Sequence, residues 1–272
     1  MPLVSTPDVD LYVEETGNGP PLLLVMGLGA SLETWVAQRD VFAQRYRVIT
    51  FDNRGAGRSG CPDAPWTVPA MAEDARAVLD FLAIERAHVL GVSMGGMIAQ
   101  ELAIRHPERV DHLVVALSFA RPDPIRRTFL LHRSWARSHG AEPISESIAH
   151  LPWLLSPATM SDGARLASIL DLVGTMPFMS PEAYARQIEA ILEYRTLERL
   201  GEVRAPTLVL AAPEDVLTPV ELSEEIAAAV PGARLVVLRR GGHGVIVEYP
   251  DDFNRVVLDW HERADDAAAR RA

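Results

Sequence analysis

The sequence predicts an α/β protein, with a mostly parallel sheet flanked by helices and a helical lobe inserted between two parts of the sheet. Short apolar runs alternate with helical patterns up to about residue 117, and again from residue 206 onward. Near-continuous apolar runs are typical of parallel strands that are buried on both faces. Between residues 121 and 200 the pattern is helical or irregular and is interrupted by prolines. We therefore expect a core of residues 1–120 and 201–272, and a helical lobe of residues 121–200.

The expected strands are an antiparallel strand around residues 12–13 and six apolar runs, at residues 22–26, 47–51, 88–91, 112–117, 207–211 and 234–238. The segments between these runs predict helices at residues 32–44, 71–82, 94–105, 220–230 and 251–263. Serine followed by proline predicts two helix starts in the lobe, at Ser156-Pro157 and Ser180-Pro181. A capping box predicts the start of helix 220–230, at Thr218, Pro219 and Glu221.

Composition excludes several classes of function. The chain has 26 basic and 37 acidic residues and a formal net charge of −11. Such a surface repels a phosphate backbone, so we expect no nucleic-acid partner. All the basic residues are arginine, which removes Schiff-base and pyridoxal-phosphate chemistry and the lysine of a standard phosphate-binding loop.

No segment predicts a membrane partner or export. The longest apolar run, residues 20–30, is too short and too rich in glycine to span a bilayer. The first ten residues lack the basic and apolar regions of a signal peptide. The single cysteine, Cys61, cannot form an internal disulfide, which suits a reducing compartment. We expect a cytoplasmic protein, and the sequence does not indicate an oligomeric state.

Ser93 is the first candidate for chemistry. It lies in Gly91-Val92-Ser93-Met94-Gly95-Gly96, which follows a predicted strand and opens a predicted helix. A nucleophilic serine on a sharp strand–turn–helix junction needs small neighbours, and Gly91 and Gly95 supply them. The start of the following helix presents backbone amides and a positive dipole end to developing negative charge. The alternative is a packing turn that contains an ordinary serine.

A nucleophilic serine requires a base, and His243 is the strongest of eight histidines. It follows the predicted strand 234–238 and lies between glycines that let the loop approach Ser93. Catalytic groups in open α/β sheets gather at the carboxyl ends of the strands. Asp215 follows strand 207–211 and is the expected carboxylate that orients the imidazole, with the adjacent Glu214 as the alternative. The order serine, acid, histidine is the order of the hydrolase fold.

The loop after the first parallel strand supplies the expected oxyanion hole. One donor is the backbone amide of Met94, and the other is the amide of Leu28. Gly27 and Gly29 allow this loop to approach a substrate, and Met26 and Gly27 are expected to line the pocket.

The same glycines also suggest a dinucleotide-binding turn, because they lie between a strand and a helix. However, Leu32 occupies a position where a small residue is expected, and the chain has no lysine for a short-chain dehydrogenase. We therefore do not expect a dinucleotide, and the serine chemistry expected here uses no organic cofactor and no metal.

Taken together, these residues make the whole chain resemble α/β-hydrolase-fold serine hydrolases of the esterase and lactonase branch. The chain is similar to 3-oxoadipate enol-lactonases and to methylesterases that act on polyketides. The resemblance is carried by Met26-Gly27-Leu28-Gly29, Phe51-Asp52-Asn53-Arg54-Gly55-Ala56-Gly57-Arg58-Ser59, Gly91 to Gly96, Glu214-Asp215 and Gly242-His243. Many relatives have His-Gly in place of Met26-Gly27, so the pocket wall here lacks a polar group while the backbone donor is retained.

The resemblance implies that residues 52–59 form a structural turn in which Asp52 and Arg54 are paired. It also implies that the lobe is a cap over the site. The expected pocket residues from this cap are Trp135, Trp153, Met176 and Phe178, and the alternative is that they only pack the lobe. Three arginines share one helix face, and they either form a solvated face or attract an acidic substrate: Arg126, Arg133 and Arg137.

The expected reaction is hydrolysis of a small-molecule carboxylic ester or lactone through an acyl-enzyme on Ser93. Two alternatives use the same triad, namely carbon–carbon bond hydrolysis of diketones and perhydrolase or haloperoxidase-like activity. A third is a ligand receptor that keeps the triad but does not turn over its ligand. Serine at the nucleophile position argues against haloalkane dehalogenase and epoxide hydrolase chemistry, which need a carboxylate nucleophile.

Overall fold

The core of the protein is an eight-stranded sheet with strand order β1-β2-β4-β3-β5-β6-β7-β8. A computed structural model describes residues 3–269 of the chain. Strands β1 and β2 run antiparallel to their neighbours, and all pairs from β4 to β8 are parallel. The strands are β1 Leu3–Ser5, β2 Asp10–Thr16, β3 Pro21–Val25, β4 Arg47–Phe51, β5 Ala87–Val92, β6 Val110–Ala116, β7 Thr207–Ala211 and β8 Arg234–Val237.

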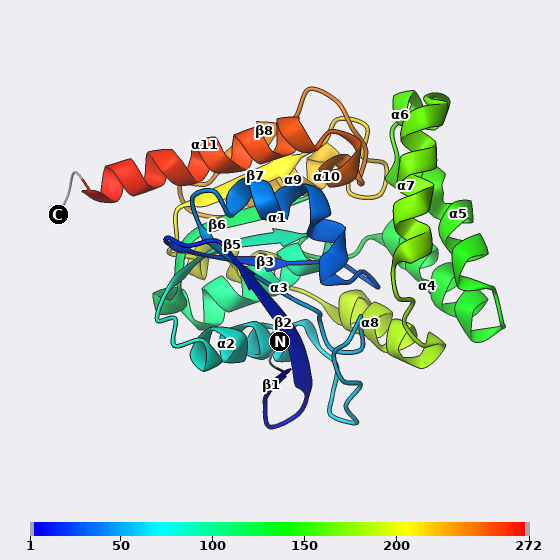
Figure 1. The fold of residues 1–272 in the computed structure, drawn as a ribbon, viewed down its shortest axis with the longest axis horizontal. Coiled ribbons are helices and arrows are strands. Elements are labelled where there is room, and N and C mark those ends of the chain that lie inside the picture. The colour runs from blue at the N-terminus through cyan, green and yellow to red at the C-terminus, as the bar shows by residue number, and fades with distance from the viewer. Residues whose placement is uncertain (1–2, 270–272) are drawn as a thin grey trace.

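Helices cover both faces of this sheet (Figure 1). One face packs against α1 Val36–Phe42, α10 Val245–Glu248 and α11 Pro250–Ala269. The other packs against α2 Val68–Phe81, α3 Met94–Arg105 and α9 Val220–Ala229. Alternate side chains of each central strand therefore enter different cores. In β3, for example, Leu23 and Val25 pack with α2 and α3, whereas Leu22 and Leu24 pack with α1 and α11.

Five further helices lie between β6 and β7 and form the helical lobe, which we define as residues 121–200. They are α4 Pro124–Ser138, α5 Pro143–Leu154, α6 Pro157–Ser161, α7 Gly163–Thr175 and α8 Pro181–Glu193. Figure 1 shows α4 to α7 gathered at one end of the sheet. Helix α8 joins the lobe to the core, because Ala183 and Ile188 belong to the same apolar cluster as α2 and α3.

The local helix signals mostly agree with the structure. Ser156 and Ser180 accept hydrogen bonds from the amides of Thr159 and Ala183, so both predicted caps form. Helix α3 has the predicted bounds. The expected helix 32–44 is divided into a 3-10 turn, Leu32–Trp35, and α1. Two other 3-10 turns are Pro107–Arg109 and Leu197–Glu202.

The predicted capping box at α9 does not form. Pro219 occupies the N-cap position of α9, and no side chain caps the helix there. The Thr218 hydroxyl instead donates to Asp215 Oδ2 at 2.5 Å. The Thr218 side chain therefore does not cap α9. It contacts Asp215, the residue expected to orient His243.

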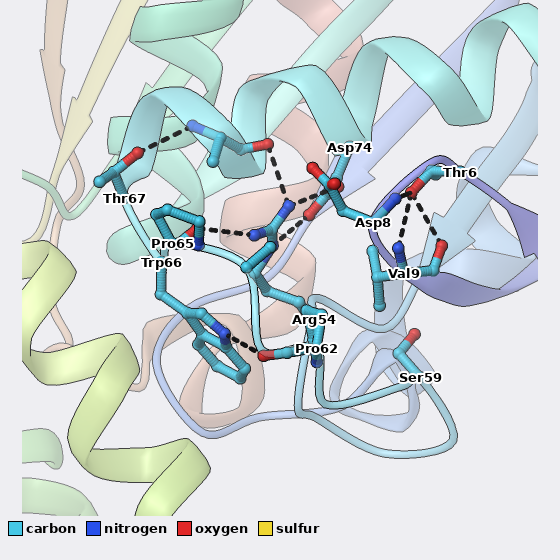
Figure 2. A network of polar contacts seen from close by, with 12 residues as sticks. Thr6, Asp8, Val9, Arg54, Ser59, Pro62, Pro65, Trp66, Thr67 and Asp74 are labelled. Carbon is cyan, nitrogen blue, oxygen red and sulfur yellow. Dashed lines mark hydrogen bonds and ion pairs between the residues drawn. The ribbon is translucent and has the colours of Figure 1, made fainter.

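The expected pairing of Asp52 with Arg54 is wrong. The Arg54 guanidinium binds Asp74 of α2 through two hydrogen bonds of 2.7 and 2.8 Å (Figure 2). It also donates to Pro65 O at 3.0 Å. Asp52 instead accepts hydrogen bonds from the amides of Leu32 and Arg58. Both residues still tie the turn 52–59 to the core, and burial raises the pKa of both Asp52 and Asp74.

Among the helices of residues 3–269, none is both long enough and apolar enough to cross a membrane.

Candidate active site

Ser93 lies on a strained turn between β5 and α3. Its φ of 58° and ψ of −121° are rarely adopted by a residue with a side chain, and they expose the hydroxyl at the end of the strand. A Cβ on Gly91 would lie 2.1 Å from Gly95 O, and a Cβ on Gly95 would lie 2.0 Å from Val25 O. Only glycine fits at either position, because the chain passes so close to itself.

His243 meets Ser93 from the loop that follows β8. Its Nε2 is 3.0 Å from Ser93 Oγ, and its Nδ1 is 2.8 Å from Asp215 Oδ2. An ionised carboxylate can only accept, so the proton lies on Nδ1 and the Nε2 lone pair faces the serine hydroxyl. The three side chains therefore form one hydrogen-bonded line with the arrangement that a general base requires.

Asp215 is buried and surrounded by donors. Its Oδ1 accepts from the amides of Leu217 and Thr218 at 2.9 and 2.7 Å. Burial alone would raise the pKa of Asp215. The charge and hydrogen bond of His243, together with the hydrogen bonds of Thr218, outweigh that effect and hold the pKa below its ordinary value. The carboxylate is consequently ionised at neutral pH.

Glu214, the alternative acid, is directed elsewhere. Its Oε1 accepts a hydrogen bond from the amide of Gly241 at 2.9 Å. The amide of Glu214 in turn donates to Gly241 O at 3.0 Å. Glu214 thus joins the end of β7 to the loop that carries His243, whereas Asp215 contacts the imidazole.

The loop after β3 packs directly on the serine. A Cβ on Gly27 would lie 3.0 Å from Ser93 Cβ and 3.3 Å from Val92 O. Two side chains hold this loop: Asn53 donates to Met26 O at 2.8 Å, and Gln187 accepts from the amide of Gly29 at 2.9 Å. Leu28 lies between these two attachments, so its amide belongs to a fixed part of the backbone beside Ser93.

A cavity of about 270 Å³ opens over Ser93 and His243. Most of its lining is apolar and comes from the helical lobe and the loop after β3. Of the expected pocket residues, four belong to this lining: Met26, Gly27, Met176 and Phe178.

Trp135 and Trp153 do not line this cavity. Trp135 is 59% exposed and stacks on His139, and Trp153 packs against the ring of Phe129. The helical period explains the position of Trp135. One face of α4 lines the cavity, through Arg126, Phe129, Leu130, Arg133 and Arg137, and Trp135 lies on the other face. The three arginines therefore face the cavity and do not form a solvated stripe.

Glu248 of α10, which no sequence motif indicates, contacts both the histidine loop and the helical lobe. Its Oε1 accepts from the amide of Gly242, and its Oε2 accepts from both the amide and the hydroxyl of Ser156. Gly244 N also donates to Leu154 O at 2.6 Å. The histidine loop is thus tied to the helical lobe. The sequence signal that could have indicated Glu248 is its place as an acid directly after the apolar run 245–247, five residues after His243.

A second polar group lies inside the lobe. Arg133 donates to both carboxylate oxygens of Glu146, at 2.6 and 3.2 Å. Burial would raise the pKa of Glu146, but hydrogen bonds from His150 and Arg133 lower it to about 2. Both Arg133 and Glu146 line the cavity as a neutral pair.

Among the described residues, one group has the arrangement of possible metal ligands. It consists of His88, His112 and His261, whose ligand atoms lie within 4.8 Å of one another. His88 lies near the amino end of β5, whereas Ser93 follows the carboxyl end of the same strand. This cluster is therefore separate from the cavity.

Comparison with known proteins identifies the family. Residues 20–138 match the α/β hydrolase fold family, and residues 187–259 match the family described as TAP-like protein. The chain is 34% identical over 261 residues to the RutD protein of Azorhizobium caulinodans, whose provisional name is carbamate hydrolase. That match covers 96% of this chain and 98% of RutD.

Two solved structures are similar along almost the whole chain. One is the enol-lactonase of Burkholderia xenovorans LB400, with 27% identity, a TM-score of 0.84 and coverage of 93% of this chain and 97% of that one. The other is a thermophilic esterase of Thermogutta terrifontis, with 28% identity, a TM-score of 0.85 and coverage of 96% and 97%. The chain belongs to the α/β hydrolase fold family, and its relatives are hydrolases.

Proposed function

We propose that the protein hydrolyses carboxylic esters or lactones through an acyl-enzyme, with Ser93 as nucleophile, His243 as general base and Asp215 as its orienting carboxylate. The observation that carries this proposal is the hydrogen-bonded line from Ser93 Oγ through His243 to Asp215 at the floor of an apolar cavity. Relatives named as an enol-lactonase and an esterase support the same class of reaction.

In the first half of the reaction, Ser93 Oγ attacks the carbonyl carbon while its proton moves to His243 Nε2. The tetrahedral intermediate then breaks the bond to the leaving oxygen, which takes the proton from His243. In the second half, water gives a proton to His243 and attacks the acyl carbon, and Ser93 leaves and regains its proton. The buried carboxylate of Asp215 stabilises the imidazolium in both halves.

The amides of Leu28 and Met94 are the proposed oxyanion donors. The contact of Gly27 with Ser93 supports this role for Leu28, and the position of Met94 at the first residue of α3 supports the other donor. Loss of one such donor typically costs about 3–4 kcal/mol of transition-state stabilisation. The helical lobe acts as the cap in this proposal, and the reaction uses no metal or organic cofactor.

The proposal is tested by the intact mass of the protein after incubation with a fluorophosphonate. We expect one adduct on the native chain and none on Ser93→Ala. Ser147 also lines the cavity, and its hydroxyl donates to Pro143 O, so Ser147→Ala is a matched control that retains the adduct. An adduct that persists in Ser93→Ala would contradict the proposal.

Substrate panels then separate the ester proposal from its alternatives. We expect turnover of an aryl ester and a lactone, with little turnover of a β-diketone or an N-alkyl carbamate. Turnover of the diketone alone would favour carbon–carbon bond hydrolysis. Turnover of the carbamate alone would align the chain with the name given to RutD.

A further inference from the structure

Three histidines interrupt the apolar core between the sheet and α11. His88 of β5, His112 of β6 and His261 of α11 are at most 7% exposed, and His261 is fully buried. The positions that follow on the same strand faces are apolar and pack in this core: Leu90, Val92, Val114 and Ala116. A buried imidazole in such a core is unfavourable unless its nitrogen atoms are bound, so packing alone does not explain the three residues.

A β-bulge brings the two strand histidines together. The pairing of β5 with β6 shifts by one residue between Ala87 and Val89, so His88 lies opposite residues 111 and 112 of β6. A bulge of this kind changes the direction of a side chain. The rings of His88 and His112 are stacked, with centroids 4.9 Å apart, and their Nδ1 atoms are 3.0 Å apart.

His261 reaches this pair from α11, which lies along the sheet (Figure 1). It follows Phe253 and Val257 at intervals of four residues, so it lies on the face of α11 that packs on the strands. The centroid of its ring is 4.8 Å from that of His88 and 6.4 Å from that of His112. Both ring nitrogens of His261 are buried, and neither has a hydrogen-bond partner among the described residues.

The positions of the nitrogen atoms suit a shared metal ion. One ring nitrogen from each histidine lies within 4.8 Å of the other two. Zinc binds imidazole nitrogen at about 2.0–2.1 Å, so two such ligands of a tetrahedral ion are about 3.3 Å apart. His88 and His112 are already near this separation, and a movement of about 1.5 Å would complete the set with His261.

We propose that His88, His112 and His261 bind one divalent transition-metal ion, which fastens α11 to β5 and β6. Imidazole nitrogen suits zinc, copper and nickel, whereas magnesium and calcium prefer oxygen ligands. Three protein ligands leave a fourth position for water. An ion held in this way would also satisfy a nitrogen of His261 that otherwise has no partner.

The proposed ion has a structural role and takes no part in the reaction proposed at Ser93. His88 is the second residue of β5, and Ser93 follows the last of its six residues. At a rise of about 3.3 Å per residue, the two positions are roughly 17 Å apart along the strand. Binding of the ion should therefore change the stability of the protein and not its kcat on an ester.

The first test measures zinc binding by the full chain without an added histidine tag. The protein is stripped with a chelator, dialysed and titrated with zinc chloride in a calorimeter. We expect one zinc ion per chain with a Kd of about 1 µM or lower, and no binding of magnesium. X-ray absorption at the zinc edge should show imidazole nitrogen at about 2.0–2.1 Å. Failure to bind zinc, or oxygen ligands alone, would overturn the site.

Variants assign the ligands. His261→Leu replaces a buried imidazole by an apolar side chain and should weaken zinc binding at least about 100-fold. His112→Leu, at the most exposed of the three positions, should do the same and provides the test if His261→Leu does not fold. The matched control is His139→Gln, which removes an exposed histidine and should retain the native affinity. Native affinity in a folded leucine variant would overturn the site.

Thermal unfolding tests the structural role. Zinc at about 100-fold above its Kd should raise the Tm of the native protein by about 5 °C. The same addition should leave the Tm of His261→Leu unchanged, and His139→Gln should respond as the native protein does. An equal rise in Tm for His261→Leu, or a loss of ester hydrolysis when zinc is removed from protein that stays folded, would contradict the proposal.

Discussion

The orientation of His243 depends on the oxygen atoms around it. Asp215 Oδ2 accepts from both His243 Nδ1 and the Thr218 hydroxyl, and Oδ1 accepts two amides. The carboxylate has therefore little freedom to rotate. In the proposed mechanism, this carboxylate sets the tautomer of the imidazole and stabilises its charged form.

Replacing Asp215 by Asn should test that role at the residue scale. The amide is nearly isosteric, but its NH₂ group favours the wrong imidazole tautomer, so we expect kcat to fall by roughly 10⁴-fold. Glu214→Gln is the matched control, because Glu214 contacts the Gly241 amide and not the histidine. Steady-state kinetics on an aryl ester measures both variants, and similar losses in the two would contradict the assignment of Asp215.

At the scale of elements, the junction of β5 and α3 is held by close backbone packing. The Ser93 amide donates to Ala116 O, and the Ser118 hydroxyl donates to Ser93 O. These bonds and the two close glycines fix the strained φ of Ser93. The cost of that strain, about 1–3 kcal/mol, is offset by the surrounding packing.

Gly95→Ala should therefore destabilise the protein by about 3 kcal/mol or more, because the new methyl group would lie 2.0 Å from Val25 O. Gly174→Ala in α7 is the control, since nothing lies within 4 Å of its added Cβ. Alanine is a better helix former than glycine, so this variant should be neutral or slightly more stable. Urea denaturation provides both values, and equal stability of the two variants would contradict the packing argument.

The elements that the sequence predicts well are those with local signals. Helix α3 follows a glycine-rich turn, and the caps at Ser156 and Ser180 depend on residues only three positions away. Strand β1 is missed because three residues carry no recognisable period. The residues of the proposed triad are likewise indicated by their positions after predicted strands.

Interactions between distant segments are less predictable. Arg54 binds Asp74 and not the nearby Asp52, because α2 brings Asp74 to the turn. Glu248 connects the histidine loop to Ser156, which is 92 residues away in sequence. Trp135 and the three arginines lie on different faces of α4, but the sequence alone does not indicate which of these faces meets the cavity. These features depend on how the lobe docks on the core.

At the scale of the whole molecule, buried polar groups as well as apolar packing join the lobe to the core, as Glu248 does through Ser156 and Gly242.

A buried ion pair also stabilises the lobe itself. Glu146 links Arg133 to His150, and its pKa of about 2 lies below the ordinary value of 4.5. A carboxylate with a depressed pKa in the folded state stabilises that state above its unfolded pKa. This stabilisation is lost as pH falls through the folded pKa.

The free energy of unfolding should therefore decrease between about pH 4.5 and 2 as Glu146 is protonated. Glu146→Gln should be less stable than the native protein at pH 7, since Arg133 loses its buried partner. The difference between the two proteins should shrink as pH falls below 4.5. Urea denaturation across this range measures it, and a difference that is constant with pH would contradict the ion pair's role.

The central claim is that Ser93 forms an acyl-enzyme. The most direct test is to quench a reaction with an aryl ester within one turnover and to locate the acyl group by peptide mass mapping. We predict one acyl group, on the peptide that contains Ser93, in the native protein and none in Ser93→Ala. Product release without an acylated peptide, or an acyl group on another residue, would contradict the account.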